Sequence, residues 1–130
     1  MKYYYSKQLK NVSFDEAVEK VTEALKHEGF GVLTEIDVQA TLKNKLDVDF
    51  RPYKILGACN PPYAHKALSI EDKIGIMLPC NVIVQATADG TIEVAAVDPV
   101  ASMSAIENPE LMEIAVEIQQ KLKTVIEKLH

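Results

Sequence analysis

The chain has 130 residues, of which 48% are hydrophobic and 25% are charged, a composition typical of an ordinary globular protein. This length fits one α+β domain spanning residues 1–130, with one sizeable core. The net charge of −5 and the single arginine, Arg51, argue against nucleic-acid binding, because phosphates must be neutralised by lysine and arginine.

No apolar run approaches the roughly 20 residues that cross a bilayer, so we expect no membrane association. The first residues, Met1-Lys2-Tyr3-Tyr4-Tyr5, lack the apolar region and cleavage site of a signal peptide. We therefore expect a cytoplasmic protein. The reducing conditions of that compartment disfavour a structural disulfide between Cys59 and Cys80.

The first third of the chain predicts a strand followed by a capped helix. Weak alternation over residues 2–9 indicates the strand. Ser13 with Glu16 three residues later forms a capping-box pattern, which predicts the start of a helix. Gly29 suits the position after a helix end, so we expect this helix to run to about Glu28.

Two further elements follow directly. Apolar alternation predicts a second strand from Phe30 to Gln39. The segment from Ala40 to Asp47 places Leu42 and Leu46 four residues apart, which predicts a short helix packed by these two leucines.

The middle of the chain predicts a buried strand and a short helix. Tyr53 to Cys59 is almost entirely apolar, which is typical of a strand buried on both faces or at an interface. Pro61-Pro62 must leave the sheet, because neither proline can donate a ladder hydrogen bond. We expect a short helix from Tyr63 to Ile70, and then a strand or loop edge from Lys73 to Leu78.

The last third of the chain predicts a hairpin and a long helix. Cys80 to Ala88 and Thr91 to Val97 have strand patterns, and Asp89-Gly90 between them is a two-residue hairpin signal. Asn108 and Pro109 are typical of an N-cap and a first helical position. The helix that follows carries a long apolar stripe of Leu111, Ile114, Ala115, Ile118, Leu122, Val125, Ile126 and Leu129.

This order of elements predicts an α+β fold, with a single mainly antiparallel sheet and two long helices packed on one face. The other face would then need a cover. On the hairpin it would carry a mixed set of side chains, namely Ile83, Gln85, Thr87, Glu93, Ala95 and Val97. This face is too apolar for bulk water, so we expect a homodimer formed through it.

A candidate site lies where two Cys-Asn dipeptides, Cys59-Asn60 and Cys80-Asn81, meet proline-bearing loops. If the two strands are antiparallel neighbours, both cysteines lie at the same end of the sheet. Asparagine closes turns by bonding nearby backbone, but two such dipeptides at one sheet end exceed what turns require. We therefore expect a small-ligand site that includes Tyr63 together with Cys59, Asn60, Cys80 and Asn81.

The two cysteines allow three interpretations. Cys59, Cys80 and His65 could hold a zinc or copper ion, because thiolate and imidazole suit these metals, although a fourth ligand is missing. Either thiol could instead act as a nucleophile with His65 as its base. The simplest interpretation is that both cysteines are small buried hydrophobic residues of the core.

Three segments together resemble the family called domain of unknown function 302, and the resemblance covers almost the whole chain. They are Gly31-Val32-Leu33-Thr34-Glu35-Ile36-Asp37, Pro52-Tyr53-Lys54-Ile55-Leu56-Gly57-Ala58-Cys59-Asn60-Pro61 and Gly75-Ile76-Met77-Leu78-Pro79-Cys80-Asn81-Val82. The resemblance implies a β-α-β(4)-α chain with the fold of the TATA-binding protein, a bacterial or archaeal origin, and dimers. It implies no established reaction.

These observations favour a non-enzymatic, dimeric module that binds a small ligand or soft metal ion at the cysteine end of the sheet. A thiol-dependent enzyme and a structural protein–protein adaptor are the alternatives.

Overall fold

A computed structural model describes residues 2–130 and contains one antiparallel sheet of five strands. The strands lie in the order β1-β5-β4-β3-β2, so the first two strands of the chain form the two edges. The bounds are β1 Tyr4–Leu9, β2 Gly31–Asp37, β3 Tyr53–Cys59, β4 Cys80–Ala86 and β5 Ile92–Val97.

The helices connect these strands or follow them. Their bounds are α1 Phe14–His27, α2 Val38–Leu46, α3 Pro61–Ile70, the 3-10 helix η1 Asp72–Met77, α4 Pro99–Ser102 and α5 Pro109–Lys128. No helix within residues 2–130 is long and apolar enough to cross a membrane.

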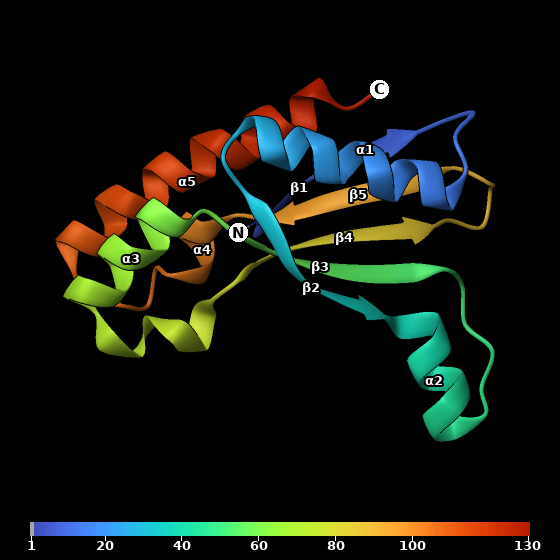
Figure 1. Cartoon of the computed structure of the whole chain (residues 1–130), viewed down its shortest axis with the longest axis horizontal. Coiled ribbons are helices and arrows are strands. Elements are labelled where there is room, and N and C mark those ends of the chain that lie inside the picture. Colours follow the sequence, from blue (N-terminus) through green and yellow to red (C-terminus); the bar gives the residue numbers. More distant parts are fainter. Residues whose placement is uncertain (1) are drawn as a thin grey trace.

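The two long helices, α1 and α5, cover one face of the sheet and leave the other face open (Figure 1). The short helix α2 projects from the edge strand β2 on the open side. This arrangement confirms the predicted α+β class, with one sheet and two long helices on a single face.

Local signals fix where the long helices begin. The Ser13 hydroxyl accepts a hydrogen bond from the Glu16 N–H at 3.0 Å, while the Glu16 carboxylate accepts one from the Ser13 N–H at 3.2 Å. At α5, the Asn108 side chain accepts from Leu111 N–H at 3.3 Å and Pro109 is the first helical residue. Both predicted N-termini are confirmed, because each cap bonds backbone donors that lack a partner in the first turn.

The core lies between the helices and the covered face of the sheet. Alternate residues of the central strands point into it, among them Val82, Val84 and Val94, all with no exposed surface. Leu25 of α1 and Leu122 of α5 pack against them and are equally buried. Cys80 belongs to this cluster and is 5% exposed.

The helix α5 is longer than the sheet that it covers. Its 20 residues span about 30 Å, whereas a strand of 7 residues such as β4 spans about 23 Å. Beyond the end of the strands, α3, η1 and α4 pack below the overhanging N-terminal half of α5 (Figure 1). A second, smaller core forms there from Ala67, Ile74, Met103, Leu111 and Ala115.

The edge strand β2 differs from its prediction by a bulge. Val32 pairs with Ala58 but Thr34 pairs with Gly57, so Leu33 is the extra residue. The bulge reverses the side-chain alternation, and Val32 and Thr34 therefore face opposite sides of the sheet although simple alternation predicts the same side.

Three other local predictions were wrong. Leu46 does not pack α2, because it is 66% exposed, and α2 has no fully buried residue. Residues 73–77 of the predicted segment 73–78 belong to the 3-10 helix η1 rather than to a strand or loop edge. The hairpin loop is longer than two residues, since Thr87 N–H bonds Thr91 O at 2.9 Å and Gly90 adopts a φ of 85° between them.

Candidate functional site

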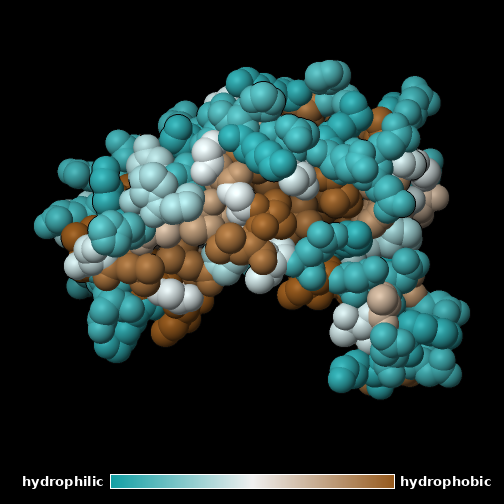
Figure 2. All heavy atoms as spheres, viewed as in Figure 1, coloured by the Kyte–Doolittle hydropathy of each residue, from teal (hydrophilic) through white to brown (hydrophobic). Residues whose placement is uncertain are grey.

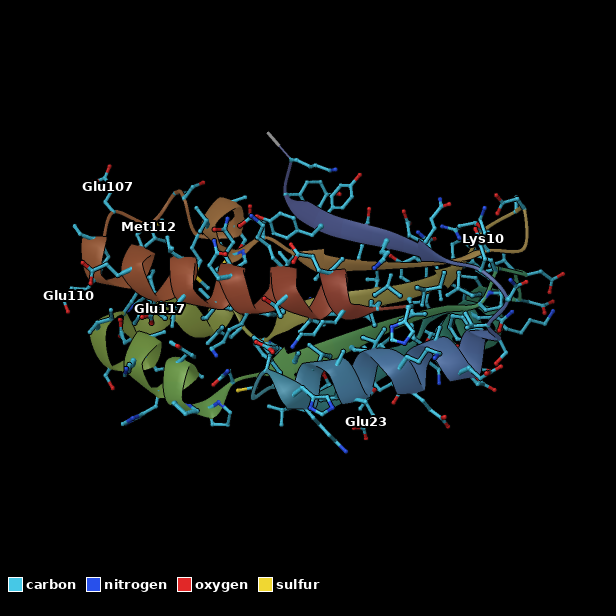
Figure 3. The ribbon with its side chains drawn as sticks, turned by 90° about the horizontal axis from the view of Figure 1, so that it is seen from above. Lys10, Glu23, Glu107, Glu110, Met112 and Glu117 are labelled. Carbon is cyan, nitrogen blue, oxygen red and sulfur yellow. The ribbon has the colours of Figure 1, made fainter. Side chains whose placement is uncertain are left out.

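A cavity of about 280 Å³ lies at the end of the sheet, between the main core and the smaller one. In Figure 3, α1 and α3 lie along the same side of α5. The cavity lies below the N-terminal half of α5, beside α3, and is partly open, since Leu33 and Leu68 of its wall are 69% and 45% exposed. It is lined by Phe30, Leu33, Thr34, Ala58, Cys59, Asn60, Tyr63, Ala64, Ala67, Leu68, Leu78, Pro79, Cys80, Met103, Leu111, Ile114 and Ile118.

Both cysteines line this cavity. In the register of β3 with β4, Ala58 lies opposite Cys80, so Cys59 is one residue from the pairing position. The expectation that both cysteines lie at the same end of the sheet is confirmed. Both thiols are free, with Cys59 half-buried and Cys80 buried.

Burial raises the pKa of the Cys80 thiol from 9.0 to about 11, and the nearby Cys59 raises it further as the smaller cause. A low-dielectric environment disfavours the thiolate, which is the nucleophilic and metal-binding form of cysteine. Cys80 is therefore a neutral thiol at physiological pH.

Asn60 is the buried polar residue of the cavity wall, with 8% of its surface exposed. Its Nδ2 donates a hydrogen bond to Glu28 O at 3.2 Å and so joins the end of α1 to the start of α3. Gly29, with a φ of 86°, allows this approach, since a Cβ there would lie 3.1 Å from Nδ2. Although Asn60 occupies the N-cap position of α3, its side chain makes no capping bond to that helix.

Gly57 brings together two side chains of the cavity wall. A Cβ at this position would lie 2.8 Å from Cγ of Pro79 and closer still to Oγ1 of Thr34. Thr34 and Pro79 both line the cavity. Thr34 belongs to β2, which pairs with β3 on one side, and Pro79 lies in the loop before β4, which pairs with β3 on the other side. The absence of a side chain at Gly57 therefore lets them close over the sheet end.

Tyr63 places its ring in the cavity wall from the first turn of α3. Two ammonium groups lie near this ring, Lys66 Nζ at 5.8 Å and Lys121 Nζ at 6.0 Å from the ring centroid. Neither lysine lines the cavity. The cations stabilise the position of the tyrosine from outside and leave the cavity without a charged wall.

Two of the residues predicted for the site lie elsewhere. His65 lines a surface groove between α3 and α5 with Lys66 and Glu117, and Figure 3 shows Glu117 on the side of α5 that faces α3. Asn81 is exposed and lines a groove on the open face of the sheet with Ile83. Within residues 2–130, no group of three or more His, Cys, Asp or Glu side chains could hold a metal ion.

Several residues of the wall were not predicted from the sequence. Leu111, Ile114 and Ile118 belong to the predicted apolar stripe of α5. The stripe continues along the whole helix, so its pattern does not show which of its residues lie beyond the end of the sheet. Leu33 reaches the cavity because of the bulge, and Met103 comes from the segment after α4, for which no element was predicted.

The fold defines a small α+β protein with one covered sheet face and an apolar cavity at the sheet end. The chain belongs to the family described as "Domain of unknown function DUF302", whose model matches residues 5–129. It is similar to the uncharacterized conserved protein DUF302 from Bacillus stearothermophilus, with 30% sequence identity, complete coverage of both chains and a TM-score of 0.91. No curated protein matches the chain.

Proposed function

We propose that this protein is a non-enzymatic binding module that holds a small apolar molecule in the cavity lined by Cys59 and Cys80. The observation that carries the proposal is a cavity of about 280 Å³ whose wall is almost entirely hydrophobic. Ligand sites are typically concave and apolar with a few polar groups that orient the ligand, and the volume of this cavity lies just below their usual range.

The chemistry of the wall favours binding over catalysis. The raised pKa of Cys80, about 11, keeps this thiol protonated, so it is a poor nucleophile and a poor metal ligand near pH 7. His65, the candidate base and third metal ligand, lines a different groove. A thiol-dependent enzyme or a soft metal site would need a partner group that the cavity wall does not supply.

We expect the wild-type protein to bind benzofuran, a neutral two-ring molecule, and to gain thermal stability as its concentration rises above the dissociation constant. The substitution Ala64→Leu should weaken binding by about tenfold or more, because the added carbons occupy the cavity that Ala64 lines. Chemical-shift titration of ¹⁵N-labelled protein measures both affinities.

The matched control is Ala24→Leu, which enlarges a half-buried alanine of α1 that does not line the cavity. This variant should keep the wild-type affinity. If benzofuran shifts no resonances of the cavity wall in the wild-type protein, the binding proposal is wrong.

The open face of the sheet supports the homodimer as a second part of the proposal. Ile36 on this face is 48% exposed, and Ile55, Ile83 and Val97 are only half-buried. Figure 2 shows hydrophobic side chains gathered in the hollow between the α3 end of the molecule and α2. Stacking of two such faces would remove this apolar surface from water in a self-complementary, two-fold interface.

We expect light scattering to give the mass of a dimer at a protein concentration on the order of tens of micromolar, at which a stable interface is formed. Ile83→Glu should shift the mass towards the monomer, because it places a charge on the open face. Gln120→Glu on the exposed side of α5 adds the same charge and should leave the mass unchanged. A wild-type monomer under these conditions contradicts the proposal.

A further inference from the structure

We infer that the ligand is an uncharged molecule with one hydrogen-bond donor, and that this donor bonds Oδ1 of Asn60. The inference rests on the proposed function and defines the ligand class for the same cavity. Three properties of the wall carry it: the bonding of Asn60, the charge of the lining residues and the size of the space.

The first property is an unused acceptor on a buried side chain. Asn60 is 8% exposed and its Nδ2 donates to Glu28 O at 3.2 Å. Because a carbonyl oxygen only accepts hydrogen bonds, this contact fixes which end of the amide is nitrogen and turns Oδ1 away from it.

Oδ1 itself accepts no hydrogen bond from residues 2–130. Every fully buried side-chain oxygen or nitrogen among these residues has a hydrogen-bond partner. Since Oδ1 has none, it is not fully buried and retains some solvent-accessible surface. Asn60 is one of the residues that line the cavity, so the inferred donor would reach Oδ1 from the cavity side. A bound molecule that displaces water from this space must offer a donor to Oδ1, or the oxygen becomes a buried acceptor without a partner.

The second property is the absence of charge. Of the described residues that line the cavity, none is Asp, Glu, Lys, Arg or His. An ion transferred into such a space loses its hydration without gaining an opposite charge, which is far more costly than burial of a neutral group. The wall therefore discriminates against carboxylates and amines.

The third property is size. A cavity of roughly 150 Å³ accepts benzene, so a cavity of about 280 Å³ accepts roughly 11 non-hydrogen atoms at the same occupancy. A two-ring heterocycle or a medium-length aliphatic alcohol fits this limit. A nucleotide or a long acyl chain would extend well beyond the cavity.

Indole and benzofuran test the donor directly, because they share size and shape and differ only in a ring N–H that becomes an oxygen. We expect the wild-type protein to bind indole about five- to tenfold more tightly, the factor that one hydrogen bond to a buried acceptor supplies. The side-chain amide resonances of Asn60 should shift more with indole than with benzofuran.

Substitutions of two polar residues of the wall locate the effect. Asn60→Leu should remove the preference for indole, whereas Thr34→Val, which removes the hydroxyl beside Gly57 at nearly constant shape, should keep it. Asn60→Leu also loses the bond to Glu28 O and can unfold the chain, but the comparison of the two probes on wild-type protein decides the matter without it.

The outcomes separate this inference from the proposed function. Equal affinities for indole and benzofuran leave the cavity as a binding site and overturn the donor assignment. Tighter binding of indole-2-carboxylate than of indole overturns the assignment of an uncharged ligand. If neither indole nor benzofuran binds, the proposed function fails and this inference fails with it.

Discussion

The free energy of unfolding should fall steeply between pH 9 and pH 11 in the wild-type protein and less steeply in Cys80→Ala. In the folded protein burial raises the pKa of Cys80 to about 11, whereas the same thiol ionises near 9.0 in the unfolded chain. Below pH 9 both states are protonated and the full stability is present. Between these two pKa values only the unfolded state loses its proton, so stability is lost as the pH rises.

A difference of about two pKa units corresponds to a loss of about 2 kcal/mol by pH 11, which approaches its full value only above that pH. Urea unfolding of the wild-type protein and of Cys80→Ala at pH 8 and pH 10.5 measures this loss. Subtracting the change in unfolding free energy of Cys80→Ala from that of the wild type removes the contribution of lysines and tyrosines. Cys59→Ala is the control. It should lose almost as much stability at high pH as the wild type, because burial of Cys80, and not the nearby Cys59, is the larger cause of the raised pKa of Cys80. Parallel curves for wild type and Cys80→Ala contradict the assignment.

Gly57→Ala should destabilise the protein by about 1–3 kcal/mol, the usual range for overpacking a closely packed site. The new Cβ would lie 2.8 Å from Cγ of Pro79 and still closer to Oγ1 of Thr34. The threonine hydroxyl can rotate away, but the proline ring is fixed to the backbone, so the strand itself must shift. Chemical denaturation at pH 7 measures the change.

Gly31→Ala provides a control in the neighbouring strand, because a Cβ there meets no atom within 4 Å. It should be neutral or stabilise the chain by up to about 1 kcal/mol, since it restricts the unfolded state. Adding Thr34→Ala to Gly57→Ala should recover only part of the loss. Full recovery, or a Gly57→Ala protein as stable as the wild type, shows that Pro79 does not limit this position.

The elements that the sequence predicted best are those with a local chemical signal. The capping box at Ser13, the Asn108-Pro109 pair and the apolar strand ending at Cys59 each depend on neighbouring residues. The bulge at Leu33 and the exposure of Leu46 depend on partners distant in the chain or on their absence. Alternation alone cannot reveal such partners, because a bulge changes the face without changing the composition.

The site shows the same division. The two Cys-Asn dipeptides mark the end of the sheet where the cavity lies, and Cys59, Asn60, Tyr63 and Cys80 all line it. Asn81 lies on the opposite face, as adjacent residues of a strand must, despite sharing the dipeptide with Cys80. The cavity itself could not be predicted, because it arises from a mismatch in length between α5 and the strands rather than from any motif.

The position of β1 at the edge beside β5 has a consequence for the order in which the chain can fold. Tyr4 pairs with Val97 and Leu9 with Ile92, whereas β2, β3 and β4 each pair with the next strand of the chain. During synthesis the N-terminal strand leaves the ribosome first and has no partner until the last strand emerges. Pairing of β1 with β5 closes a loop that contains most of the chain, which is entropically costly. A nascent chain that ends before β5 therefore has unpaired edges on both β1 and β4.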